Sequence, residues 1–241
     1  MPVLLLMLLG TSIATGTGVI LLVLHWRAKH STDQTLALRT SSLLLDATPR
    51  LTAFLPRPTS WLAIRSRKVV AVQEALGLHN PHPCSWADGL SPGRKLFIAP
   101  PVNGWILIIG SGLPDPADDV DTCFHFLSHL TRKLGHVQFF SANRVLGHHA
   151  WVRAEGGQIE RAYAWAGKTV WNQGQKTRAE IELNLQCFQY FEAPDNAAFD
   201  STETRFINVE KVPLLAARWS LDPTSVDEQL LEHALGIAGE L

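Results

Sequence analysis

The first apolar stretch of the chain is long enough to cross a membrane. Residues Val3 to Leu24 contain no charged side chain. As a helix that rises about 1.5 Å per residue, this stretch would span roughly 30 Å, the thickness of the hydrocarbon core of a bilayer. The alternative is a cleaved signal peptide, which would have a basic side chain ahead of the apolar stretch, and none is present. The pattern therefore predicts a transmembrane helix and its flank within residues 1–30.

The residues that flank this stretch predict its orientation. Trp26, Arg27 and Lys29 follow the last apolar residue. Aromatic rings favour the membrane interface, and positive charges favour its cytoplasmic side. We therefore expect a single-pass protein of the cell membrane with its N-terminus outside and its soluble domain in the cytoplasm. In the opposite orientation, the tryptophans of an extracytoplasmic domain could stack on glycans.

Small side chains recur at every fourth position of the same stretch, at Gly10, Ala14 and Gly18. This spacing lines one face of a helix and allows a second helix to approach closely. The face could bind a second copy of the chain or a protein partner, although small residues are also common in membrane helices that have no partner. Residues 31–59 contain three prolines, which interrupt any helix that continues from the membrane, and we interpret them as a linker.

Between residues 60 and 142, short apolar runs alternate with segments in which apolar residues recur at helical spacing. Runs of about five apolar residues predict strands, and apolar residues three and four apart predict helices. The clearest helix would be capped by Asp118 or Asp119 and end before Gly135. In chain order, the predicted elements are strand 61–65, helix 68–76, strand 95–99, strand 105–109, helix 119–134 and strand 136–142. This is the order of a split βαβ unit, so we expect an α+β, ferredoxin-like core.

A β-hairpin is predicted next, with Gly156 and Gly157 as its two-residue turn between segments 148–155 and 158–166. In this register Arg153 faces Glu160, an opposite-charge pair that favours the pairing. Simple alternation then places eight residues on one face, which we expect to be buried. They are His148, Ala150, Val152, Ala154, Ile159, Arg161, Tyr163 and Trp165.

The C-terminal part of the chain is predicted to be mainly helical. Thr177 and Glu180 form a capping-box pattern that opens a helix. Two further helices are predicted over residues 209–219 and 223–235, the second with proline in its first turn. We therefore expect an α+β domain over residues 60–192, followed by a loop and helical extension over residues 193–241.

Composition limits the possible partners. The 21 basic and 22 acidic residues give a formal net charge of −1, so no basic surplus indicates a nucleic-acid partner. The three cysteines, Cys84, Cys123 and Cys187, are odd in number and far apart, which is typical of a reducing compartment rather than of a disulfide framework.

One candidate catalytic site lies in a proline-rich segment that contains His79, His82 and Cys84. A helix N-terminus after Cys84 would lower the pKa of its thiol, and either histidine could act as the base. The same residues could supply ligands to zinc, which needs four that converge. The alternative is a surface loop stiffened by prolines around a buried thiol.

A candidate ligand-binding site lies on the predicted hairpin. His148, Arg161, Tyr163 and Trp165 share the face expected to be buried, and polar groups among apolar ones can bind an anionic or aromatic ligand. The alternative is an internally hydrogen-bonded edge of the core, since buried polar groups are usually paired.

No sequence motif indicates a particular chemistry. The chain lacks a G-x-S-x-G elbow, a phosphate-cradling G-x-x-x-x-G-K-[ST] loop, an H-E-x-x-H pair and a C-x-x-C pair. We therefore expect a membrane-tethered cytoplasmic binding or interaction module without catalysis, cofactor or resident metal. The alternative is a hydrolase-like enzyme that uses Cys84 with His79 or His82, or a bound zinc ion.

Overall fold

A computed structural model describes residues 58–91, 95–192, 202–226 and 234–241, with the backbone alone for residues 202–207. The predicted membrane helix, its small-residue face of Gly10, Ala14 and Gly18, and nearly all of the predicted linker lie outside these residues. Within the described ranges, no helix has both the length and the apolar character needed to cross a bilayer.

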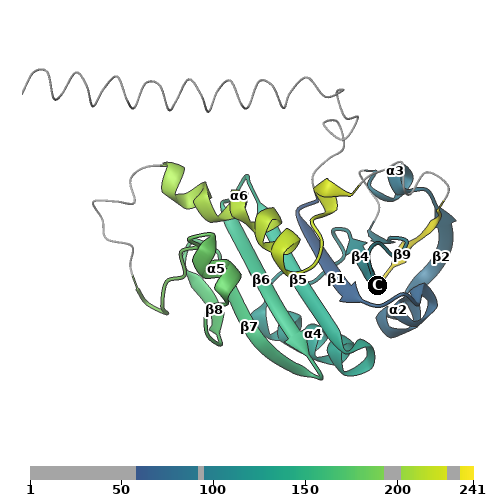
Figure 1. The fold of residues 1–241 in the computed structure, drawn as a ribbon, viewed down its shortest axis with the longest axis horizontal. Coiled ribbons are helices and arrows are strands. Elements are labelled where there is room, and N and C mark those ends of the chain that lie inside the picture. The colour runs from purple at the N-terminus through teal and green to yellow at the C-terminus, as the bar shows by residue number, and fades with distance from the viewer. Residues whose placement is uncertain (1–57, 92–94, 193–201, 227–233) are drawn as a thin grey trace, which may run out of the picture. The chain divides into compact units, whose positions relative to one another are not determined.

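The strands form one nine-stranded sheet in the order β2-β9-β3-β4-β1-β5-β6-β7-β8, and every neighbouring pair is antiparallel. Figure 1 shows the sheet with its helices. The strands are β1 (Ser60–Arg65), β2 (His79–Cys84), β3 (Leu96–Ile98), β4 (Trp105–Ile109), β5 (His136–Asn143), β6 (His148–Glu155), β7 (Gln158–Trp165), β8 (Thr169–Gln173) and β9 (Gly236–Glu240).

The prediction of a ferredoxin-like core is wrong, because all nine strands, including those of the additional hairpin, belong to one large antiparallel sheet. The proline-rich segment at residues 79–84 is an edge strand, β2, where a missing backbone N–H is tolerated. The last residues of the chain form β9, which lies between β2 and β3. The structure describes only the two ends of the predicted helix 223–235. Residues Pro223–Ser225 form a short 3₁₀-helix, η2, and residues 234 and 235 precede β9 without regular secondary structure.

Both faces of the sheet are buried, because apolar residues occupy successive positions of its central strands. Leu62 and Ile64 point into one core, and Trp61 and Ala63 point into the other. The first core packs against α2 (Val69–Leu76) and α4 (Val120–Leu134). The second packs against α6 (Thr202–Trp219), which crosses β5 and β6 (Figure 1). Two shorter helices, α3 (Trp86–Gly89) and α5 (Arg178–Glu182), also lie along the second core.

The hairpin of β6 and β7 forms with the expected turn but a different register. Gly156 and Gly157 have φ angles of 58° and 89°, as a turn of this kind requires. Arg153 pairs with Arg161 and Ala154 with Ile159, so Glu160 is an extra residue in β7, a β-bulge. The bulge turns Tyr163 and Trp165 to the face of Trp151, whereas the predicted face placed them with Ala150 and Val152. The predicted ion pair is confirmed, since Arg153 Nε lies 2.9 Å from Glu160 Oε2.

Candidate functional site

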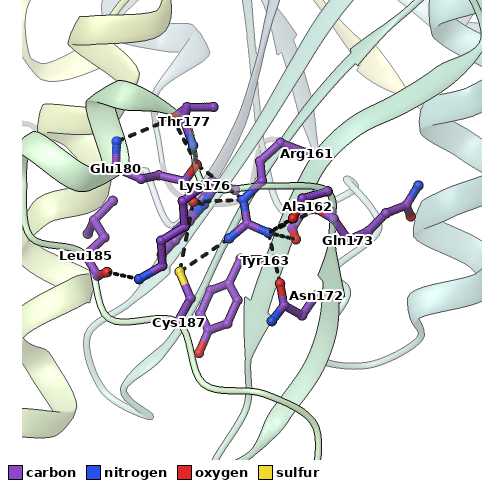
Figure 2. Close-up of polar contacts among 12 residues, drawn as sticks. Arg161, Ala162, Tyr163, Asn172, Gln173, Lys176, Thr177, Glu180, Leu185 and Cys187 are labelled. Carbon is purple, nitrogen blue, oxygen red and sulfur yellow. Dashed lines mark hydrogen bonds and ion pairs between the residues drawn. The ribbon is translucent and has the colours of Figure 1, made fainter.

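A buried ion pair lies on the α6 face of the sheet, between β7 and α5 (Figure 2). The side chain of Arg161 is 2% exposed and that of Glu180 is fully buried. Arg161 Nε donates to both carboxylate oxygens, at 2.9 Å to Oε1 and 3.2 Å to Oε2. Because burying two charges is costly, such a pair persists only when its other hydrogen-bonding groups are also satisfied.

The capping box of α5 orients Glu180. Thr177 is the N-cap residue, and its backbone N–H and hydroxyl donate to Glu180 Oε2 at 2.7 and 2.9 Å. Trp151 Nε1 donates to Glu180 Oε1 at 2.8 Å from the neighbouring strand β6. A local signal that opens a helix thus also places a carboxylate in the core, where it receives hydrogen bonds from four residues, namely Arg161, Thr177, Trp151 and, at 3.9 Å, the thiol of Cys187.

The remaining nitrogens of Arg161 contact the end of β8 and the segment that follows α5. Nη1 donates to Asn172 Oδ1 at 2.9 Å and to the carbonyls of Gln173 and Gly174 at 3.0 and 3.3 Å. Nη2 donates to Cys187 Sγ at 3.3 Å. Figure 2 shows these contacts converging on the guanidinium. Each of its three nitrogens therefore has at least one protein partner.

Tyr163 and Cys187 complete this cluster, and both keep their protons at neutral pH. The ring centroid of Tyr163 lies 5.9 Å from Arg161 Cζ, and its hydroxyl accepts the backbone N–H of Phe188 at 3.2 Å. Burial raises the pKa of Tyr163 to about 12 and that of the Cys187 thiol to about 11. A thiolate nucleophile at Cys187 is therefore disfavoured near neutral pH.

Gly174 gives a test of how tightly this cluster is packed. Its φ is +73°, and a Cβ built on it would lie 2.1 Å from the carbonyl oxygen of Glu160. We expect Gly174→Ala to lower the free energy of unfolding by about 2 kcal/mol or more, because left-handed strain adds to a clash between backbones. Urea-induced unfolding would measure the loss.

Gly167→Ala is the matched control for Gly174→Ala. Gly167 has the same φ of +73° with no atom within 4 Å of a built Cβ. Gly167→Ala should lower the free energy of unfolding only by the conformational strain, about 1 kcal/mol. Equal losses from the two variants would mean that the close approach of Gly174 to the backbone of Glu160 does not matter for stability.

The four residues of the predicted ligand site do not all lie together. Arg161, Tyr163 and Trp165 follow each other along the α6 face of β7, and Trp165 and Tyr163 belong to the same core. His148 lies at the first position of β6, where it pairs with Asn143. Its neighbour His149 takes the position opposite Trp165. Simple alternation placed His148, and not His149, opposite Trp165, because the apolar pattern does not reveal the bulge at Glu160.

His149 is held as a neutral imidazole in the core. It is 5% exposed and stacks on Trp151 at a centroid distance of 5.8 Å. Its Nδ1 lies 3.2 Å from the Gly147 carbonyl, and its Nε2 lies 3.1 Å from Asn208 Nδ2. An amide N–H can only donate, so Nε2 is the acceptor and Nδ1 carries the proton. Burial lowers the pKa of His149 to about 4.

The predicted catalytic residues lie on the edge strand β2. His79 and His82 are exposed, and Cys84 is buried in the second core with Trp86 and Phe97. Among the described residues, no group of three or more His, Cys, Asp or Glu side chains could hold a metal ion. The hydrolase alternative stays a prediction, which titration of the Cys84 thiol against pH would test.

A pocket of about 600 Å³ opens beside Trp165, at the turn between β7 and β8. Its walls are mostly apolar, and Lys168 and Glu192 add one charge of each sign. Tyr190 and Phe191 are exposed residues of its lining, and Phe191 is fully exposed. The lining residues are Trp165, Gly167, Lys168, Thr169, Val170, Tyr190, Phe191 and Glu192.

Tyr190 also protects the edge of the sheet next to this pocket. Its hydroxyl accepts the backbone N–H of Asn172 at 2.7 Å, on the side of β8 that has no neighbouring strand. An open strand edge can pair with another chain, and this hydroxyl occupies one of the donors that such pairing would use.

Comparisons of the chain with protein-family models, with curated proteins and with solved structures found no match.

Proposed function

We propose that the chain is a membrane-tethered, cytoplasmic and non-catalytic binding module, whose pocket beside Trp165 takes an apolar side chain of a protein partner. The observation that carries this proposal is the pocket itself, which is concave, mainly apolar and bordered by the fully exposed ring of Phe191. Aromatic residues at the margin of a concave apolar surface are characteristic of protein-binding hot spots.

The environment of Arg161 supports binding rather than catalysis. Its guanidinium contacts a carboxylate, backbone carbonyls, an amide oxygen and a thiol, all from the protein. The arginine thus supports the β7–β8 hairpin, whose turn carries Trp165, Gly167 and Lys168 into the pocket wall. A rigid frame of this kind lowers the entropy cost of binding.

Photo-crosslinking in membranes would test the proposal. A benzophenone amino acid at position 191 of the full chain should give a discrete adduct. The same amino acid at position 145 should not, although Val145 is also apolar and 88% exposed. Filling the pocket with Val170→Phe should reduce the adduct at least tenfold, whereas Val145→Phe should leave it unchanged. Equal adducts from positions 191 and 145 would contradict a partner site at the pocket.

Two further measurements address tethering and catalysis. A reporter fused to Leu241 should be active only on the cytoplasmic side, and the full chain should resist extraction from membranes by alkaline carbonate. Turnover of a broad substrate panel by the purified chain, with loss of turnover in Cys84→Ala or His148→Ala, would contradict a non-catalytic role.

A further inference from the structure

A second pocket, of about 540 Å³, lies at the opposite strand ends of the sheet from the Trp165 pocket. Arg65, at the end of β1, pairs with Trp105, at the start of β4. The loop after β1 supplies one wall and the turn before β4 supplies the other. The lining residues are Arg65, Ser66, Arg67, Asn103, Gly104 and Trp105.

Neither arginine of this pocket forms an ion pair with a described residue. In residues 58–91 and the other described ranges, no carboxylate lies within 4 Å of the guanidinium of Arg65 or Arg67. Carboxylates further along this end of the sheet have other partners. Glu155 lies 3.6 Å from His136, and Glu160 lies 2.9 Å from Arg153. Two like charges in one pocket repel each other, and a bound anion would relieve that repulsion.

The turn between β3 and β4 adds backbone donors. Val102 and Trp105 exchange both of their N–H···O bonds, at 2.8 and 2.9 Å, which closes a two-residue turn. Asn103 and Gly104 have φ angles of 50° and 82°, and within the described part of the chain their N–H groups donate to no protein acceptor. Successive N–H groups in such turns are suited to anions.

We propose that the pocket formed by Arg65, Arg67 and the Asn103–Gly104 turn binds a phosphate-bearing anion. Each guanidinium presents a planar fork that matches two oxygens, and a phosphate group has enough oxygens for both forks. A carboxylate has only two oxygens, which a single fork already occupies. A volume of about 540 Å³ exceeds that of a bare phosphate and leaves space for a ligand body against the indole of Trp105.

The anion could be a soluble phosphate compound or the headgroup of a lipid, and titration of the full chain in neutral detergent would distinguish the two. One series uses inorganic pyrophosphate and the other uses a short-chain phosphatidylinositol phosphate, both followed by calorimetry. Binding of pyrophosphate would indicate a soluble ligand, and binding of the lipid alone would indicate a headgroup. Absence of both would overturn the proposal.

Matched arginine variants assign the binding to this pocket. Arg67→Gln and Arg65→Gln should each weaken it at least tenfold, and Arg67→Lys should weaken it less, because charge remains while the fork is lost. Arg178→Gln removes another exposed arginine, on α5, and should leave affinity unchanged. Unchanged melting temperatures would show that the variants fold. Equal losses from Arg178→Gln and Arg67→Gln would overturn the assignment.

Discussion

Glu180→Ala is expected to lower the free energy of unfolding by about 3–5 kcal/mol. The reason is the position of Arg161, whose charge would remain buried without its counter-ion. The indole N–H of Trp151 and the backbone N–H of Thr177 would lose their acceptor at the same time. Buried donors left without partners add to the loss.

Urea-induced unfolding of the full chain, followed by tryptophan fluorescence, would measure this effect. Glu182→Ala is the matched control, because Glu182 lies two residues further along the same helix. Its carboxylate is exposed and pairs with Arg178 and Arg218 at the surface. Pairs of this kind contribute little to stability, so the control should unfold nearly as the natural chain does. Similar losses from the two variants would contradict the assignment of Glu180 to the core.

A double-mutant cycle would isolate the ion pair from the other contacts. Arg161→Met alone leaves the carboxylate of Glu180 without its charged partner, whereas Arg161→Met with Glu180→Met leaves no buried charge. The losses in the free energy of unfolding of Arg161→Met alone and Glu180→Met alone can be added to predict that of the double variant. We expect the double variant to be more stable than this sum predicts, by about 2 kcal/mol. It should still be less stable than the natural chain, because the donors of Trp151 and Thr177 stay unpaired.

Local patterns identified many elements but not the way in which they assemble. The helix capped by Asp119 forms as predicted, as do the hairpin turn at Gly156 and the capping box at Thr177. Each of these depends on residues close together in sequence. Glu180 could be recognised as a capping residue, but its contact with Arg161 depends on how α5 packs against β7.

The size of the sheet could not be inferred because its outer strands are set by distant contacts. Pro81 and Pro83 made β2 resemble a loop, yet at an edge they also discourage pairing with another chain. β9 has little apolar character, and its glycines are required by close packing. A Cβ on Gly236 would lie 2.3 Å from the ring of Phe97, and one on Gly239 would lie 2.7 Å from the carbonyl oxygen of His79.

The candidate site was only partly predictable for a related reason. Arg161, Tyr163 and Trp165 are spaced two apart and do share a face. Which histidine joins them depended on the one-residue bulge at Glu160, since a shift of one position exchanges the two faces of a strand. The arginine pocket at Arg65 and Arg67 was not predicted, because its second wall comes from a turn almost forty residues away in the chain.

Because His149, and not His148, lies in the core, part of the free energy of unfolding is expected to depend on pH. Burial lowers its pKa in the folded chain to about 4, compared with about 6.5 in an unfolded chain. Asn208 Nδ2 donates to the nitrogen that a second proton would need, and the neighbouring His148 disfavours positive charge there. Between these two pH values, the unfolded chain therefore binds a proton that the folded chain does not. The stability from His149 is complete above pH 6.5 and declines as the pH falls towards 4, by about 3 kcal/mol in total.

Unfolding free energies measured at intervals from pH 7.5 to 4.5 would reveal this loss. In His149→Gln the side chain cannot titrate but still offers an oxygen to Asn208, so the decline with falling pH should be shallower than in the natural chain. His148→Gln should keep most of the natural slope, because burial, and not the charge of His148, is the main cause of the lowered pKa of His149. If the two variants instead showed the same slope, His149 would not be the group that takes up the proton when the chain unfolds in acid.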